Sequence, residues 1–260
     1  MVEKRVDMIN KKLFVGVDAD NTLWDTDSVF AEAQLSLLSK LESTTGIEVA
    51  EGDKLNYIRQ IDQEIARLHG FDLKYPVEIL VRAVEVSLLG EDPRTAAKIA
   101  VESQFDIATL DIYGSYAKWF LEEISNNVPK LRPGVKEGLR KIADQFGKIV
   151  IFTEGRERTC WSNLKYHGVD AFVEDVILCK KGVEFYTSFV ERNKHAYLKF
   201  IMIGDQLDRD IVYAKAAGFV TIYFPGGFLP YWVDISDKHS FDYEIINFLE
   251  VSLLLENVIT

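Results

Sequence analysis

A short and unbroken apolar run near the start of the chain constrains its fold more than any other feature. Residues 13–17 read Leu-Phe-Val-Gly-Val, and the run ends abruptly at Asp18. A run that does not alternate between apolar and polar residues is typical of a strand buried on both faces of a parallel sheet. It is also far shorter than the roughly 18 apolar residues that a membrane-spanning helix needs. The run therefore predicts an internal strand of an α/β domain.

Four further apolar runs predict strands, and helical patterns separate them. The strands are expected over residues 148–152, 172–178, 199–203 and 219–224. Helices are expected over residues 134–146, 157–167, 184–192 and 209–217, the last of them capped by Gly218. Strands that alternate with helices indicate an α/β fold, a doubly wound, Rossmann-like parallel sheet. In the usual strand order, the first strand would lie at the centre of this sheet.

The stretch between the first strand and the rest of the predicted sheet breaks this alternation. It carries apolar residues at helical spacing over residues 30–41, 54–68, 77–89, 94–110 and 116–124. Glycines and a proline punctuate these segments, and none of them has a strand pattern. An insertion of about 100 residues has an ordinary domain size. The sequence thus predicts an α/β core of residues 1–26 and 130–260, interrupted by an all-helical cap domain over residues 27–129.

The charge balance narrows the choice of partners. The chain has 30 Lys and Arg against 41 Asp and Glu, a formal net charge of −11. An acidic surface repels nucleic acid and anionic membranes, although the acid excess also serves solubility. The polar residues 1–12 do not resemble a signal peptide, and two cysteines make no disulfide framework. We expect a cytoplasmic protein, a monomer or a homodimer, with neither nucleic acid nor membrane as a partner.

Polar side chains collect where the predicted strands end. Asp18 and Asp20 follow the first strand, Thr153 the second and Asp205 the fourth. Ligands of open α/β sheets bind at the carboxyl ends of the strands, so these side chains are expected to converge. Two carboxylates about 4 Å apart repel by roughly 4 kcal/mol at an effective dielectric constant of 20. Either a divalent cation or raised pKa values of the carboxyl groups must offset that repulsion. If a cation is bound, a set of oxygen ligands favours Mg²⁺.

Four short motifs resemble those of the haloacid dehalogenase (HAD) superfamily. The run Asp-Ala-Asp-Asn-Thr-Leu over residues 18–23 looks like the first motif, and Thr153 is similar to the second. The run Gly-Asp-Gln-Leu-Asp-Arg-Asp-Ile over residues 204–211 looks like the fourth. The third motif is a lysine. Its usual distance from a following acid, here Glu184, selects Lys180, while Lys181 stays possible.

The resemblance implies a phosphomonoester hydrolase with a helical cap after the first motif. Asp18 would attack phosphorus, and Asp20 would serve as the acid and base. Thr22 would hold the loop, while Thr153 and Lys180 would bind the phosphoryl oxygens. Mg²⁺ would be held by Asp18, the main-chain carbonyl of Asp20, and Asp205, with Asp210 or Asp208 next to it. Asp208 also fits a simple interaction with the helix dipole.

Several alternatives stay open at this point. A dehalogenase of the same superfamily would use the same nucleophile on carbon, but resembling dehalogenases lack the second aspartate. A phosphomutase would share every core residue, and a catalytically silent protein would bind a small molecule without turnover. Trp24 is expected either to line the pocket or to belong to the core, and Gly226–Gly227 either to cradle a phosphate or to form an ordinary turn. The substrate is expected to be a small phosphorylated metabolite.

Overall fold

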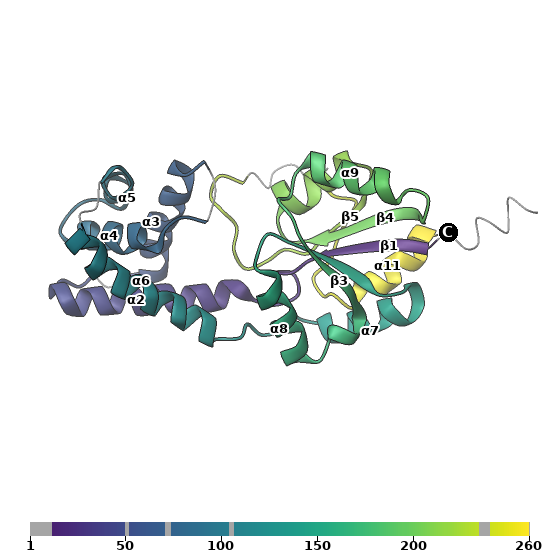
Figure 1. Cartoon of the computed structure of the whole chain (residues 1–260), viewed down its shortest axis with the longest axis horizontal. Coiled ribbons are helices and arrows are strands. Elements are labelled where there is room, and N and C mark those ends of the chain that lie inside the picture. The colour runs from purple at the N-terminus through teal and green to yellow at the C-terminus, as the bar shows by residue number, and fades with distance from the viewer. Residues whose placement is uncertain (1–11, 50–51, 71–73, 104–106, 234–239, 260) are drawn as a thin grey trace, which may run out of the picture. The chain divides into compact units, whose positions relative to one another are not determined.

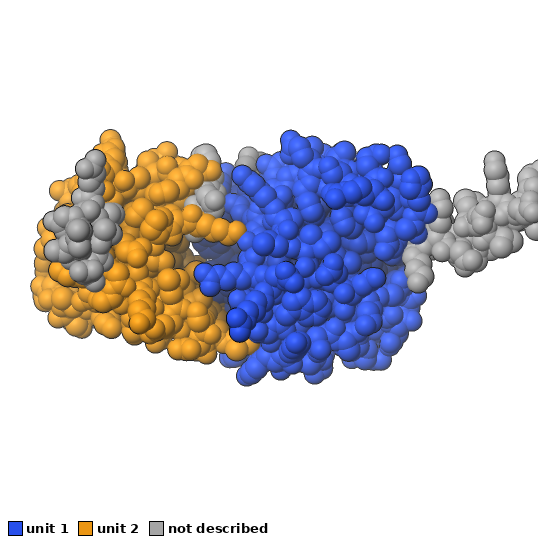
Figure 2. All heavy atoms as spheres, viewed as in Figure 1, with its two compact units in different colours: residues 1–27, 129–260 blue, residues 28–128 orange. Residues whose placement is uncertain are grey.

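The computed structural model describes residues 12–49, 52–70, 74–103, 107–233 and 240–259, and it divides the chain into two compact units. The first unit consists of residues 1–27 and 129–260, and the second of residues 28–128 (Figure 2). No helix in these described ranges is long and apolar enough to cross a membrane.

The first unit is built on a parallel six-stranded sheet in the order β3-β2-β1-β4-β5-β6 (Figure 1). The strands are β1 Lys12–Asp18, β2 Ile149–Thr153, β3 Val173–Leu178, β4 Tyr197–Gly204, β5 Val220–Tyr223 and β6 Tyr243–Glu244. The doubly wound parallel sheet and the central position of its first strand are confirmed. The two-residue strand β6 was not predicted, because so short a segment carries no periodic signal.

The side chains of β1 explain the unbroken apolar run. Leu13, Val15 and Val17 lie in one apolar cluster, whereas Phe14 lies in a second cluster on the opposite face. Helices α7 Val135–Phe146, α8 Glu157–His167 and α11 Glu250–Ile259 supply side chains to the first cluster. Helices α9 Val183–Asn193 and α10 Val212–Ala216 supply the second. Both faces of the central strand are therefore buried, so both sets of alternate side chains must be apolar.

Among the described residues, the second unit contains helices and no strand. Its first helix begins at Thr26, within the first unit. The helices are α2 Thr26–Thr45, α3 Lys54–Leu68, α4 Val77–Leu88, α5 Pro93–Glu102 and α6 Ile107–Asn126, and they share an apolar core of their own. The predicted continuous helix over residues 94–110 is wrong. Helix α5 ends at Glu102 because Ser103 adopts an extended conformation (φ −70°, ψ 133°), and α6 begins at Ile107.

Two elements near the C-terminus also differ from the prediction. The expected helix over residues 209–217 is divided into a π-helical turn, η2 Leu207–Ile211, and the α-helix α10. The carboxylate of Asp210 accepts a hydrogen bond from the backbone N–H of Gln206 at 3.1 Å, which turns it back toward the end of β4. A Cβ atom on Gly204 would lie 2.4 Å from Asp210, so only glycine admits this turn. Helix α11 was not predicted at all.

Candidate active site

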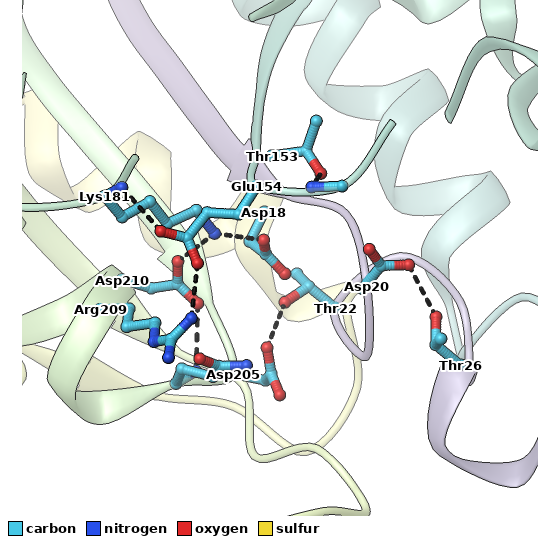
Figure 3. Close-up of polar contacts among 12 residues, drawn as sticks. Asp18, Asp20, Thr22, Thr26, Thr153, Glu154, Lys181, Asp205, Arg209 and Asp210 are labelled. Atoms are coloured by element: carbon cyan, nitrogen blue, oxygen red, sulfur yellow. Dashed lines mark hydrogen bonds and ion pairs between the residues drawn. The ribbon is translucent and has the colours of Figure 1, made fainter. Parts of the chain in front are cut away.

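The structure brings three aspartates together at the carboxyl ends of the central strands (Figure 3). Asp18 ends β1, Asp205 follows β4, and Asp210 lies in the π-helical turn after it. One carboxylate oxygen of each lies within 4.8 Å of the others, and all three side chains are buried. Asp208 is only partly buried and is not a member of this group, so Asp210 is the nearer acid.

Lys181 is the lysine that reaches this cluster. Its ammonium group donates to Asp18 and, at 2.5 Å, to Oδ1 of Asp210, and its side chain is buried (Figure 3). Of the two candidate lysines, Lys180 is exposed, and Lys181 is the one that contacts the cluster. The reason is strand alternation: the N–H of Cys179 donates to the carbonyl of Thr153 at 3.0 Å, which continues the ladder beyond β3. Neighbouring side chains of an extended segment point to opposite sides, so Lys181 turns inward where Lys180 turns outward.

The cluster holds more negative charge than Lys181 can neutralise. Burial, above all other effects, raises the pKa of Asp18 to about 7, although Lys181 acts against this shift. Burial and the neighbouring charges of Asp18 and Asp210 raise the pKa of Asp205 well above its ordinary value. Burial alone would lower the pKa of Lys181, but Asp18 and Asp210 raise it well above the usual range. The site therefore stabilises added positive charge.

One oxygen of Asp205 is left without a partner. Oδ1 of Asp205 accepts from the hydroxyl of Thr22 at 3.2 Å, whereas Oδ2 is buried and has no hydrogen bond among the described residues. Thr22 thus fixes Asp205 directly. Buried polar atoms almost always have partners, so an orphaned carboxylate oxygen beside two further aspartates fits a bound cation. Oxygen ligands without histidine or cysteine suit Mg²⁺.

Asp20 lies outside the buried group of three. The chain turns after β1, with the N–H of Leu23 donating to the carbonyl of Ala19 at 2.8 Å. The exposed carboxylate of Asp20 accepts at Oδ1 from the indole N–H of Trp24 at 3.0 Å and from the hydroxyl of Thr26 at 2.8 Å. Trp24 is 1% exposed and packs in the core of the first unit. Of its two open roles, Trp24 therefore takes the core position, and it also orients Asp20.

Thr153 ends β2 and is buried there. Its hydroxyl accepts from the N–H of Gly155 at 2.9 Å. The residue that caps α8 is Arg156, so Thr153 is not the N-cap of that helix. Thr153 instead shapes the loop that follows β2.

Arg132 is a residue near this site that the sequence reading missed. Its guanidinium donates to the carbonyl of Asn21 at 2.6 Å, to that of Phe224 at 3.1 Å and to that of Pro225 at 2.5 Å. It thereby ties the loop after β1 to the loop after β5. In that second loop, a Cβ on Gly226 would lie 2.6 Å from Oδ2 of Asp205, so the loop approaches the aspartate as only glycine allows. In the sequence, the pair Gly226–Gly227 was the signal that could have indicated this close approach.

The comparisons with known proteins agree with this geometry. A sequence model of the haloacid dehalogenase-like hydrolases matches residues 15–218, a range that contains all three clustered aspartates and Lys181. The chain belongs to this family of hydrolases.

A curated relative carries a phosphatase name. Over 117 residues the chain is 27% identical to the glyceraldehyde 3-phosphate phosphatase of Methanocaldococcus jannaschii. This alignment covers 43% of the chain and 50% of that protein, so it spans half the length of the relative.

Solved structures share the fold over nearly the whole chain. YfnB from Bacillus subtilis, a protein assigned to the HAD hydrolases and bound to magnesium, has a TM-score of 0.62 at 20% identity; the match covers 95% of this chain and 99% of that one. A predicted phosphoglycolate phosphatase from Haemophilus somnus has a TM-score of 0.58 at 17% identity, with 93% of this chain and 97% of that one covered. At these identities, the likeness shows a common fold.

Proposed function

We propose that this protein is a Mg²⁺-dependent phosphomonoester hydrolase that works through an aspartyl-phosphate on Asp18. The observation that carries the proposal is the contact of Asp18 with Lys181, within a buried group of three aspartates. A second aspartate, Asp20, stands two residues after the nucleophile and is exposed to solvent. Resembling dehalogenases lack this second acid, since a halide leaves without a proton, so Asp20 favours an ester as the substrate.

Asp18, Asp205 and the main-chain carbonyl of Asp20 would hold the metal. The unpartnered Oδ2 of Asp205 supports this assignment. Both oxygens of Asp210 already accept hydrogen bonds, one from Lys181 and one from the N–H of Gln206. Asp210 therefore orients Lys181 in our proposal and is not assigned as a direct ligand. A bound Mg²⁺ supplies charge neutralisation between the phosphoryl group and the carboxylates.

The reaction requires two displacements at phosphorus. A carboxylate oxygen of Asp18 forms a bond to phosphorus while the ester P–O bond breaks, and Asp20 donates a proton to the leaving alkoxide. Water then attacks phosphorus, Asp20 takes its proton, and the bond to Asp18 breaks to release phosphate. Lys181 and Thr153 bind the phosphoryl oxygens throughout. Positioning and charge neutralisation supply most of the catalysis in such transfers.

The proposed substrate is a small phosphorylated metabolite. Because a curated relative and a structural neighbour are named for them, glyceraldehyde 3-phosphate and phosphoglycolate are the first compounds to test. We further propose that the helical unit, residues 28–128, acts as the cap that selects the substrate.

The test is a phosphate-release assay with p-nitrophenyl phosphate in Mg²⁺, followed by a panel of phosphorylated metabolites. We expect turnover of p-nitrophenyl phosphate, and a higher kcat/KM for at least one metabolite of two to six carbons. Release of a halide from haloacids without phosphatase activity would assign a dehalogenase instead. Interconversion of sugar phosphates that outpaces phosphate release would assign a mutase, and binding without turnover a silent protein.

A further inference from the structure

Glu154 connects three segments of the chain at the edge of the candidate active site. It directly follows Thr153, and its carboxylate accepts at Oε1 from the backbone N–H of Lys181 at 2.9 Å. Its other oxygen, Oε2, accepts from the guanidinium of Arg209 at 2.6 Å. Figure 3 shows the Glu154 carboxylate between Lys181, in the loop after β3, and Arg209, in the π-helical turn η2 that follows β4. One side chain thus joins the end of β2, the loop with Lys181 and the turn that carries Asp210.

The contact with Lys181 takes the place of a strand partner. The ladder between β2 and β3 ends where the N–H of Cys179 donates to the carbonyl of Thr153. In a parallel ladder, the next N–H on the same side belongs to the residue two positions on, which is Lys181. The chain after Thr153 has turned toward α8 by then, so no backbone carbonyl of β2 receives this N–H. The carboxylate of Glu154 receives it instead.

The same carboxylate also acts on the other partner of Lys181. Arg209 immediately precedes Asp210, the residue whose Oδ1 accepts from the Lys181 ammonium at 2.5 Å. The side chains of Glu154 and Arg209 are only 20% and 25% exposed, so their ion pair is partly shielded from water. Charge-assisted hydrogen bonds of this kind are shorter and stronger than neutral ones. Both ends of the Lys181–Asp210 contact are therefore tied to one carboxylate.

We propose that Glu154, paired with Arg209, is a positioning residue that holds Lys181 at the distance from Asp18 that phosphoryl transfer requires. The inference rests on the proposed function. Glu154 does not contact the substrate in this proposal. It affects catalysis by holding Lys181 in place.

The experiment compares Glu154→Ala with Glu157→Ala. Glu157 is three residues away, exposed, and begins α8, so its substitution removes the same charge without touching Lys181. We measure kcat and KM with p-nitrophenyl phosphate, the inhibition constant of orthovanadate, and the thermal midpoint. Glu154→Ala should lower kcat by about 10- to 100-fold, as loss of a supporting contact to an active-site group commonly does. The vanadate inhibition constant should rise in parallel, while Glu157→Ala stays within about twofold of wild type.

Two further variants keep the result decisive if Glu154→Ala folds poorly. Glu154→Gln retains an oxygen for the Lys181 N–H but loses the charge that pairs with Arg209, so it should fall between wild type and Glu154→Ala. Arg209→Gln removes the other half of the pair, and combining it with Glu154→Gln should cost no more than the worse single variant, because both act through one contact. A lowered thermal midpoint with unchanged kcat and vanadate inhibition in all of these variants would overturn the proposal and leave a structural ion pair.

Failure of the proposed function itself has a different signature. A wild-type protein that neither turns over p-nitrophenyl phosphate nor binds orthovanadate in calorimetry would refute the phosphatase assignment. Wild-type vanadate binding that Glu154→Ala and Glu154→Gln leave unaltered would refute only the role of Glu154.

Discussion

The two units of this protein differ in how their buried and partly buried acidic side chains are hydrogen-bonded. In the helical unit, Glu42 accepts from the N–H of Val49 at 2.8 Å and from the ammonium of Lys54 at 2.8 and 2.9 Å. Asp62 accepts from Gln34 at 3.1 Å and from the hydroxyl of Tyr75. Every one of these carboxylate groups has its own partners.

In the α/β unit, the three clustered aspartates share few hydrogen-bonding partners. Asp18, Asp205 and Asp210 face one another around the single ammonium of Lys181, and Oδ2 of Asp205 has no partner within the described part of the chain. Unpaired buried charge is costly, so a protein retains it only where something else is gained. The acids of the helical unit thus contribute to stability, whereas the three clustered aspartates are the ones to which we assign chemistry in the proposed function.

The largest effect on turnover is expected for Asp18→Asn. Turnover of p-nitrophenyl phosphate should fall by at least about 10⁴-fold, since loss of a covalent nucleophile removes the main route of reaction. Because the substitution also removes one of the crowded negative charges, the metal-free protein should gain stability, by roughly 2–4 °C in thermal midpoint for each kcal/mol relieved. Kinetics and thermal unfolding in EDTA measure both. A variant with more than about a hundredth of wild-type activity would contradict the role of Asp18 as nucleophile, and one that is clearly destabilised would show that its charge supports the fold.

The second prediction concerns Mg²⁺ and Asp205. EDTA should abolish activity and Mg²⁺ should restore it, whereas Ca²⁺ should restore it poorly because its bonds are longer and its geometry looser. Mg²⁺ at about 100 times its Kd should stabilise the wild-type fold by about 2.7 kcal/mol. Asp205→Asn should remove most of that stabilisation along with activity. Asp208→Asn, at a partly buried acid outside the group of three, is the matched control and should keep both.

The predicted site residues that the structure places at the ends of the central strands carry a local signal in the sequence. Asp18 and Asp20 follow an unmistakable strand, and Asp205 follows another. The count from Glu184 favoured Lys180 and left Lys181 open. Which of the two lysines points inward depends on where the β3 ladder ends, and that count carries no information about it. Strand alternation beyond Leu178 would have been the better guide.

The residues that sequence reading missed act across long separations. Arg132 binds backbone carbonyls of Asn21 and Phe224, which are 111 and 92 positions away. Glu154 contacts Lys181 and Arg209, 27 and 55 positions away. No periodicity or motif encodes such pairs, because they exist only once the strand order β3-β2-β1-β4-β5 brings the loops together. The fold class was predictable from local pattern, but the supporting contacts of the site were not.

A third and smaller effect is expected in the helical unit. Tyr75→Phe deletes one of the two hydrogen bonds to Asp62, a carboxyl whose pKa is raised by burial. Loss of such a bond should destabilise the protein by about 1–3 kcal/mol. The kcat for p-nitrophenyl phosphate should stay within about twofold of wild type, since surface and packing changes away from the chemistry act mainly on stability. Tyr116→Phe, which loses a more exposed bond to Thr44, is the control and should change neither quantity measurably.

The smallest effect is expected for Thr26→Val, which tests whether a hydrogen bond of the α/β unit affects kcat and not stability. The hydroxyl of Thr26 shares Oδ1 of Asp20 with the indole N–H of Trp24, so valine leaves one of two hydrogen bonds in place. Because the contact is exposed, stability should change by less than about 0.5 kcal/mol. The kcat should nonetheless change by about 2- to 10-fold, since Asp20 is the proposed acid and base and misorientation of such a group slows proton transfer.

The control is Thr44→Val, which deletes an equally exposed hydrogen bond of a threonine in the helical unit. It should alter neither kcat nor the thermal midpoint. Equal kinetics for Thr26→Val and Thr44→Val would show that Asp20 needs no support from Thr26. If Thr26→Val instead lost stability and kept its kcat, the hydrogen bonds of the α/β unit would serve the fold as those of the helical unit do.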